Sequence, residues 1–335
     1  MTEAVPLIRA ANILPLVRFL EANGQDAAHY LDKADLGYWF ALSPLDGVPL
    51  RNGIELLVDI ARQHGPDVGT RIVSQASVYE LAFIGQVALG SRTPAEALQR
   101  VSNALPLHST HEAMRVDPSR EGVTIIHRLA LSIEPEALHA VHVLLCSMIQ
   151  QVCRFTGLKP PLLSEVRAMP HPQMGVDDIS RHIGRAAAPS TDGTLRIALA
   201  SGVASNPFRT VARDRLAGAS GQKILPLAED ATLAGSVRPV LAAMLHSGEP
   251  SIERVARSGG MSVRSLQRRL AQEGTSFSDE LDRVRRRLAL SLLQSDDMSL
   301  AELTDRLGYS SPQALSRAVW RMVGASPGRV RAQEV

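Results

Sequence analysis

Apolar residues recur at the spacing of amphipathic helices through the first 110 residues of the chain. Pro15 opens one such helix, which ends at the turn residue Gly24, so this segment has proline at its start and glycine at its end. A second apolar stripe, over about residues 53–64, is followed by Gly65. A third helix begins at Thr93, where Thr-Pro-Ala-Glu combines a capping box with proline at the first helical position. The pattern therefore predicts that the chain begins with helices.

The periodicity changes after residue 110. Residues 112–117 and 123–131 lie on either side of the turn signal at 118–122 and predict a β-hairpin. A long apolar helix over residues 135–155 follows. Two short strands come after it, at 163–168 and 195–200, with a helical stretch at 174–184 between them. The first two-thirds of the chain is therefore predicted to be an α+β domain, with helices before a small sheet.

A stretch rich in Gly, Ala and Ser, residues 217–234, shows no sustained periodicity and has the composition of a flexible linker. Every segment after residue 236 has a helical pattern. We therefore predict an α+β domain over residues 1–217, a linker over residues 218–235 and an all-α domain over residues 236–335.

An internal repeat with a period of 48–50 residues lies in the C-terminal domain, over residues 251–277 and 299–327. Each copy is a short capped helix, a glycine turn and a second capped helix. The apolar and glycine positions of the two copies coincide: Ile252 with Leu300, Val255 with Leu303, and Gly260 with Gly308. This is the pattern of two helix-turn-helix units.

The second helix of each unit carries polar side chains opposite its apolar stripe. They are Arg264, Gln267 and Arg268 in the first unit, and Gln313, Ser316 and Arg317 in the second. Arginine, glutamine and serine hydrogen-bond to base edges in the major groove of double-stranded DNA. We therefore predict that these six residues bind DNA. The alternative, two helical hairpins with solvated arginines, is disfavoured by the duplication and by the polar outward faces.

Composition and charge agree with this interpretation. The chain has 335 residues and 45% hydrophobic residues, enough for packed cores, which excludes a disordered protein. Its net charge of +2 is the sum of +4 for residues 236–335, with 15 Arg and no Lys, and −2 for the remainder. The planar fork of arginine suits phosphate and guanine. Because the whole chain has only three Lys, the charge division supports the DNA hypothesis without deciding it.

The two cysteines, Cys146 and Cys153, lie seven residues apart in one predicted helix, so reduced thiols are expected rather than a disulfide framework. The N-terminal residues lack the pattern of a signal peptide. The most apolar region, residues 140–149, is broken by His142 and is too short to span a bilayer. We therefore expect a soluble cytoplasmic protein that does not contact a membrane.

The C-terminal domain resembles the DNA-binding domain of the AraC/XylS family of bacterial transcription regulators. The matching segments are Ser-x-x-Ser-Leu-Gln-Arg-Arg-Leu-x-x-Glu-Gly-Thr-Ser-Phe at 262–277, Leu-Gly-Tyr-Ser-Ser at 307–311, Gly-Ala-Ser-Pro-x-x-x-Arg at 324–331, and Arg-x-x-x-Ala-x-x-Leu-Leu at 285–293. The resemblance implies an activator or repressor whose two recognition helices enter successive major-groove segments of a promoter, held apart by a connecting helix over residues 278–294. RNA polymerase is a further partner implied for such a regulator.

Four positions refine this resemblance. Leu315 stands where the family has an aromatic residue, and Leu303-Thr304 stands where it has Ile-Ala. These apolar or small replacements leave the predicted fold unchanged and weaken the expectation of tight DNA contact by the second unit. Arg285 matches a family position that is more often structural than DNA-binding.

The first domain is similar to the N-terminal domain of AraC-type regulators that include the ornithine-utilisation regulator. The resemblance is carried by residues 65–69, 79–85, 93–98 and 207–208. That domain is named for arabinose binding, and its members respond to varied small molecules. The resemblance implies an unidentified small-molecule effector and a homodimer. The alternative is a ligand-independent DNA-binding protein whose first domain only oligomerises.

His139, His142 and Cys146 follow one face of the long helix and are residue types that ligate metals. No carboxylate or second cluster occurs at helical spacing beside them, so core positions are favoured and no metal or other cofactor is predicted. The sequence also lacks a phosphate-binding glycine loop, a Cys-x-x-Cys pair and a His-Glu-x-x-His motif. We therefore predict no catalytic residue and no enzymatic activity.

Overall fold

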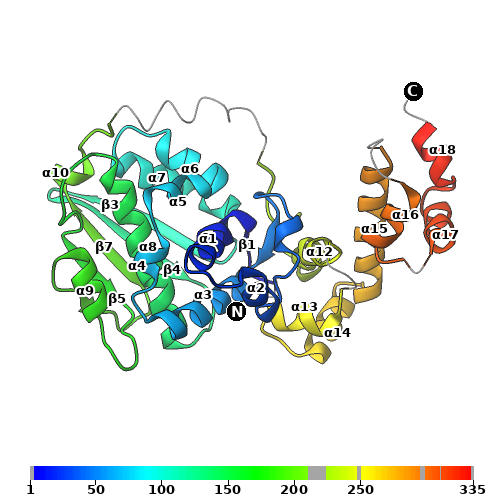
Figure 1. Ribbon diagram of the computed structural model, residues 1–335, viewed down its shortest axis with the longest axis horizontal. Coiled ribbons are helices and arrows are strands. Elements are labelled where there is room, and N and C mark those ends of the chain that lie inside the picture. The colour runs from blue at the N-terminus through cyan, green and yellow to red at the C-terminus, as the bar shows by residue number, and fades with distance from the viewer. Residues whose placement is uncertain (1–3, 210–223, 247–249, 295–298, 310, 333–335) are drawn as a thin grey trace.

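The computed structural model describes residues 4–209, 224–246, 250–294, 299–309 and 311–332. Figure 1 shows a small sheet with its covering helices at one end of the molecule and the last helices of the chain at the other. The first elements of the chain lie between these groups, beside the first helices of the C-terminal third. Within the described ranges, no helix combines the length and the apolar character that a membrane crossing requires.

The predicted helices before residue 110 are confirmed. Helix α1 (Leu14–Ala22) has Pro15 in its first turn, and α3 (Leu50–His64) ends immediately before a glycine. Helix α7 (Pro94–Ala104) is capped by the hydroxyl of Thr93. The other elements of this part are α2 (Ala27–Lys33), α4 (Gly69–Ile72), α5 (Gln75–Glu80), α6 (Ala82–Leu89) and the 3-10 helices η1 (Ala10–Ile13), η2 (Trp39–Ala41) and η3 (Leu105–Leu107). Local capping and helical periodicity are therefore sufficient to locate the longer helices here.

A two-stranded antiparallel ladder between β1 (Leu7–Arg9) and β2 (Gly47–Pro49) does not follow from the sequence pattern. Each strand has three residues, which is too short for an alternation of polar and apolar positions to be recognised. The pairing also joins segments about 40 residues apart in the chain. The ladder is thus a product of tertiary packing.

A five-stranded sheet has the order β3-β4-β7-β5-β6, antiparallel throughout except for the β5-β6 pair. Its strands are β3 (Glu112–Ser119), β4 (Gly122–Leu129), β5 (Glu165–Ala168), β6 (Ala188–Pro189) and β7 (Leu195–Ala200). The predicted hairpin is confirmed with a correction: the turn is two residues long, because Ser119 pairs with Gly122. Gly122 has φ +144°, and a Cβ there would lie 1.9 Å from the carbonyl oxygen of Leu199 on the neighbouring strand. Only glycine fits at this close approach.

Helix α8 (Pro135–Arg154) lies between the sheet and the N-terminal helices (Figure 1). Val143, Cys146 and Ile149 share a core with the strand residues Ile125 and Ile197. The opposite side of α8 contacts α3, α4 and α5. Because both sides are covered, the helix is apolar around most of its circumference, as the sequence indicates. Helices α9 (Asp177–Ile183) and α10 (Ser201–Ala204) complete this part.

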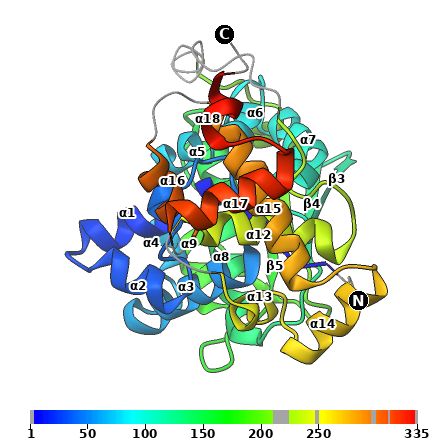
Figure 2. The same cartoon turned by 90° about the vertical axis from the view of Figure 1, so that its right-hand side faces the viewer.

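The described C-terminal region is helical, as predicted. Its helices are α12 (Leu233–Met244), α13 (Ile252–Ser258), α14 (Val263–Gln272), α15 (Phe277–Gln294), α16 (Leu300–Arg306), α17 (Pro312–Val323) and α18 (Pro327–Ala332). Buried residues of α12, α13 and α14 belong to the same core as β1, β2 and α3. In contrast, α16 and α17 form a separate core with the end of α15, built from residues such as Leu293, Leu303, Leu307 and Leu315. Figure 2 views the molecule with α15, α16, α17 and α18 toward the reader.

The predicted linker, residues 218–235, lies partly outside the described residues, which resume at residue 224. Its described portion includes Leu227 and Leu233, which are 6% and 0% exposed and belong to the core shared with the N-terminal helices. Helix α12 begins at Leu233, capped by the hydroxyl of Thr232. The domain boundaries themselves remain a prediction.

Candidate nucleic-acid interface and ligand cavity

Helix α14 presents the three polar residues that the sequence predicts for the first unit. Ser262 caps the helix, its Oγ accepting from the backbone N–H of Ser265 at 3.2 Å. Leu266 and Leu270 are fully buried, whereas the predicted residues Arg264, Gln267 and Arg268 are all exposed. Since positions three and four apart share a helix face, these three side chains form one surface that is open to solvent.

Helix α17 has the same construction. Ser311 caps it by accepting from the backbone N–H of Ala314 at 3.2 Å, and Leu315 and Val319 are each 1% exposed. Among the residues predicted for the second unit, Gln313 and Arg317 are exposed and Ser316 is half-buried. The two faces lie at opposite ends of α15, whose 18 residues correspond to roughly 27 Å of helix.

Trp320 is a feature of this face that the sequence interpretation missed. Its side chain is 55% exposed, which is unusual for a large aromatic residue. It lies three and four residues after Arg317 and Ser316, and these residues line a shallow hollow with Arg321 and Ser326. Helical spacing from Arg317 is the signal that could have identified it, because the indole must share the outward face.

Three arginines of α15 make contacts within the protein. Arg285 donates from Nε to the carbonyl oxygen of Leu307 at 3.0 Å and from Nη2 to that of Gly308 at 3.3 Å, and its guanidinium lies 5.2 Å from the ring centre of Tyr309. It therefore fixes the end of α16 against α15. Arg283 and Arg287 pair with the carboxylates of Glu280 and Glu229 respectively.

We predict that Arg285→Ala lowers the free energy of unfolding of this part by about 2 kcal/mol, because two carbonyl groups lose a charged donor. Arg286→Ala is the matched control: it removes the same charge at an exposed position and should change stability by less than about 0.5 kcal/mol. Denaturant unfolding followed by Trp320 fluorescence, in a Trp39→Phe background, measures both. Equal stabilities of the two variants would contradict the structural role of Arg285.

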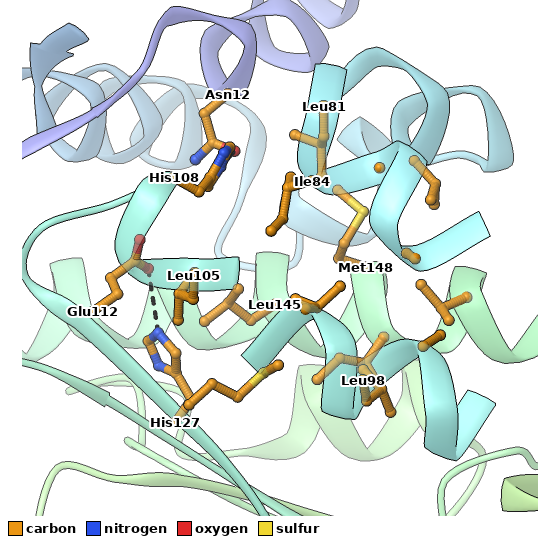
Figure 3. A pocket seen from close by; sticks show the side chains of 18 of the residues that line it. Asn12, Leu81, Ile84, Leu98, Leu105, His108, Glu112, His127, Leu145 and Met148 are labelled. Carbon is orange, nitrogen blue, oxygen red and sulfur yellow. Dashed lines mark hydrogen bonds and ion pairs between the residues drawn. The ribbon is translucent and has the colours of Figure 1, made fainter. Parts of the chain in front are cut away.

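A cavity of about 130 Å³ lies in the N-terminal part, bounded by the β3-β4 hairpin, by α8 and by α5, α6 and α7. Figure 3 shows that apolar and polar side chains line different parts of this cavity. Apolar side chains cover most of the wall, among them Leu81, Ile84, Leu98, Leu145 and Met148. The polar side chains gather at one end and are Asn12, His108, Glu112 and His127. An apolar cavity with a few convergent polar groups is the usual form of a small-molecule site.

Glu112 and His127 meet because of the hairpin register. His127 is paired with Met114, so Glu112 lies on the same face, diagonally across the two strands. His127 Nε2 and Glu112 Oε1 are 3.2 Å apart (Figure 3). Burial alone would raise the pKa of Glu112, but the hydrogen bond and the charge of His127 outweigh it and leave this pKa below its usual value. Glu112 is therefore a carboxylate, and His127 donates from Nε2.

His108 is the second imidazole at the polar end. Burial lowers its pKa to about 4, so the ring is neutral near pH 7. Its Nε2 lies 3.3 Å from Oδ1 of Asn12, an oxygen that can only accept, and Nε2 therefore carries the proton. The Nδ1 lone pair is buried and has no hydrogen-bond partner among the described residues. Alternation along the predicted hairpin could have paired Glu112 with His127, but no sequence signal joins His108 to Asn12, which is 96 residues away.

Both histidines of α8 form hydrogen bonds to residues outside this helix. Nε2 of His139 lies 2.8 Å from Oδ2 of Asp178, and its Nδ1 lies 2.8 Å from the carbonyl oxygen of Met169. His142 Nδ1 accepts from the backbone N–H of Met169 at 2.9 Å. Cys146 is buried in the sheet-facing core, and its burial raises the pKa of the thiol. Within the described part of the chain, no three His, Cys, Asp or Glu side chains are placed to hold a metal ion.

Two family profiles match this chain. The arabinose-binding domain of AraC transcription regulators matches residues 24–188, and a helix-turn-helix domain matches residues 255–333. The chain belongs to the AraC family of transcription regulators. The resemblance recognised from the sequence is thereby confirmed, for both parts of the chain. This AraC-family chain is a DNA-binding bacterial transcription regulator and not an enzyme.

Several known proteins are similar to this regulator. The transcriptional regulator VirS of Mycobacterium tuberculosis is 24% identical over 332 residues, which cover 97% of this chain and 96% of VirS. The ornithine utilization regulator of Pseudomonas aeruginosa is 37% identical over 82 residues, 24% of each chain. Among solved structures, the transcriptional regulator CdpR of Pseudomonas aeruginosa has 21% identity and a TM-score of 0.42, covering 96% of this chain and 98% of CdpR.

Proposed function

We propose that α13–α14 and α16–α17 are two helix-turn-helix units of a sequence-specific regulator, joined by α15 as the connecting helix. The observation that carries this proposal is the polar face on the second helix of each unit. Arg264, Gln267 and Arg268 are exposed on α14, and on α17 Gln313 and Arg317 are exposed and Ser316 is half-buried. Arginine and glutamine in such positions read guanine and adenine edges. Two units separated by a rigid helix would read successive major-groove segments.

We further propose that a small-molecule effector binds in the N-terminal cavity and controls the DNA-binding helices. Contacts between the N-terminal part and helices α12 and α13 could transmit this control. Asp35 forms ion pairs with Arg257 at 2.8 Å and Arg254 at 3.3 Å, and the backbone N–H of Val5 donates to Oγ of Ser236 at 2.8 Å. A ligand that prefers one arrangement of these contacts would shift the population of DNA-competent molecules. A homodimer and contact with RNA polymerase belong to the same proposal.

Genome-wide mapping of bound DNA in the source organism tests the central claim. Discrete promoter sites are expected. Binding without sequence preference would contradict a sequence-specific regulator. Thermal-shift screening of the full-length chain with a broad metabolite library tests effector control separately: discrete sites without stabilisation by any metabolite would favour a ligand-independent DNA binder whose N-terminal part only oligomerises.

A further inference from the structure

We infer that the effector cavity takes a neutral monocyclic aromatic molecule with one hydrogen-bond donor, the chemistry of a phenol. The inference rests on the proposed effector site and adds its ligand class. It is carried by three properties of the cavity: its volume, the thioethers in its wall, and the set of acceptors at its polar end.

The volume limits the ligand to about one ring. The cavity measures about 130 Å³. An apolar cavity of roughly 150 Å³ holds one benzene molecule. A two-ring ligand or a long acyl chain would therefore require the helices that line the cavity to move apart. A monocyclic molecule fits with side-chain adjustment alone.

The wall favours an aromatic ring over a sugar ring. Leucine, isoleucine and alanine side chains provide most of the surface, and Met114 and Met148 bring two thioethers to it. Thioether sulfur makes favourable contacts with aromatic ring edges. A sugar of the same size would bury several hydroxyl groups against this apolar wall, and unsatisfied buried hydroxyls are costly.

The polar end of the cavity favours a ligand with a hydrogen-bond donor and disfavours an anionic ligand. Glu112 is ionised and can accept a further hydrogen bond, and the unpartnered Nδ1 of His108 is also an acceptor. No lysine or arginine occurs among the lining residues, all of which are described. A carboxylate ligand would lie beside the ionised Glu112 with no lysine or arginine to compensate its charge, whereas a phenolic O–H can donate to either acceptor.

Isothermal titration calorimetry on the full-length chain tests this inference with phenol, toluene and benzoate. Toluene matches phenol in size but has no donor, and benzoate carries a negative charge. Phenol should bind at least about tenfold more tightly than either, because the donor-less ligand leaves a buried acceptor unpaired. Equal binding of toluene, or tighter binding of benzoate, would overturn the inference.

Three variants test whether phenol binds in this cavity. Ala97→Leu fills the cavity at a position that is 0% exposed and should abolish phenol binding, whereas Ala113→Leu, at an exposed position next to Glu112 in β3, should leave it unchanged. Glu112→Gln keeps the side-chain volume and should reduce the preference for phenol over benzoate, which tests the inference even where Ala97→Leu does not fold.

Failure of this inference is distinguishable from failure of the proposed function. A chain that binds discrete promoter sites but not phenol refutes only the ligand class. Phenol binding that survives Ala97→Leu in a folded variant refutes the assignment to this cavity. A chain that binds no discrete DNA sites refutes the proposed regulator, whatever its affinity for phenol.

Discussion

Replacing Glu280 with alanine is expected to lower the free energy of unfolding by about 3 kcal/mol, because it removes one partner of a buried ion pair. Oε2 of Glu280 lies 2.6 Å from Nε of Arg238, and the two side chains are 0% and 11% exposed. The pair joins α12 to α15. Glu229 still contacts Arg238 in the variant, at 2.7 Å, so the expected loss is at the low end for a broken buried pair. Urea unfolding of the purified chain measures it.

A matched control distinguishes the buried pair from a surface one. Arg287→Ala breaks the exposed ion pair with Glu229 and should cost less than about 1 kcal/mol. A double Arg238→Met and Glu280→Met variant should recover most of the stability, since neither charge is then left unpaired. Glu280→Ala with wild-type stability would contradict the role of this pair in holding α12 to α15.

The destabilisation by Glu280→Ala should diminish in acid. Burial acts to raise the pKa of Glu280, but hydrogen bonds from Arg238 and Thr275 outweigh it, so the folded-state pKa lies below the ordinary value. A lowered pKa contributes stability above the unfolded-state pKa, which is about 4.3 for glutamate, and that contribution is lost as the pH falls through the folded-state pKa. The stability difference between the wild type and Glu280→Ala should therefore shrink below about pH 4.

Removing Arg268 and Arg317 together is expected to weaken binding to a mapped promoter site by about 2–6 kcal/mol, since one base-reading arginine is worth about 1–3 kcal/mol and the two positions lie in separate units. Each single variant should relax the preference at one base pair. Arg268 and Arg317 are exposed on α14 and α17, so folding should be unaffected. Fluorescence anisotropy with the promoter site and with random DNA, at fixed salt, measures the loss.

Arg128→Ala is the charge-matched control for each of the two single variants, because Arg128 is exposed on β4, away from both helices. It should leave promoter binding unchanged. If the double variant lost affinity equally for promoter and random DNA, both arginines would be phosphate contacts that position the protein without reading sequence.

The longer helices could be predicted because their signals are local. A proline in the first turn of α1, Thr93 before α7 and Ser311 before α17 each mark a helix start within a few residues. The position of the hairpin turn was predicted correctly, but the predicted turn was too long. The sequence does not show that strand pairing continues to Ser119 and Gly122. The two-residue strand β6 is too short to produce any pattern.

The sequence by itself determined the family, the repeat and the outward faces of α14 and α17, because caps, helical periodicity and motif spacing depend on residues close together in the chain. Only the tertiary structure decided that His108 meets Asn12 beside Glu112, that Arg238 on α12 pairs with Glu280 on α15, and that α12 to α14 share a core with the N-terminal helices. These contacts join segments tens to hundreds of residues apart. The free energy that selects such contacts comes from burying side chains together, and a local pattern shows which residues are apolar without showing which of them meet.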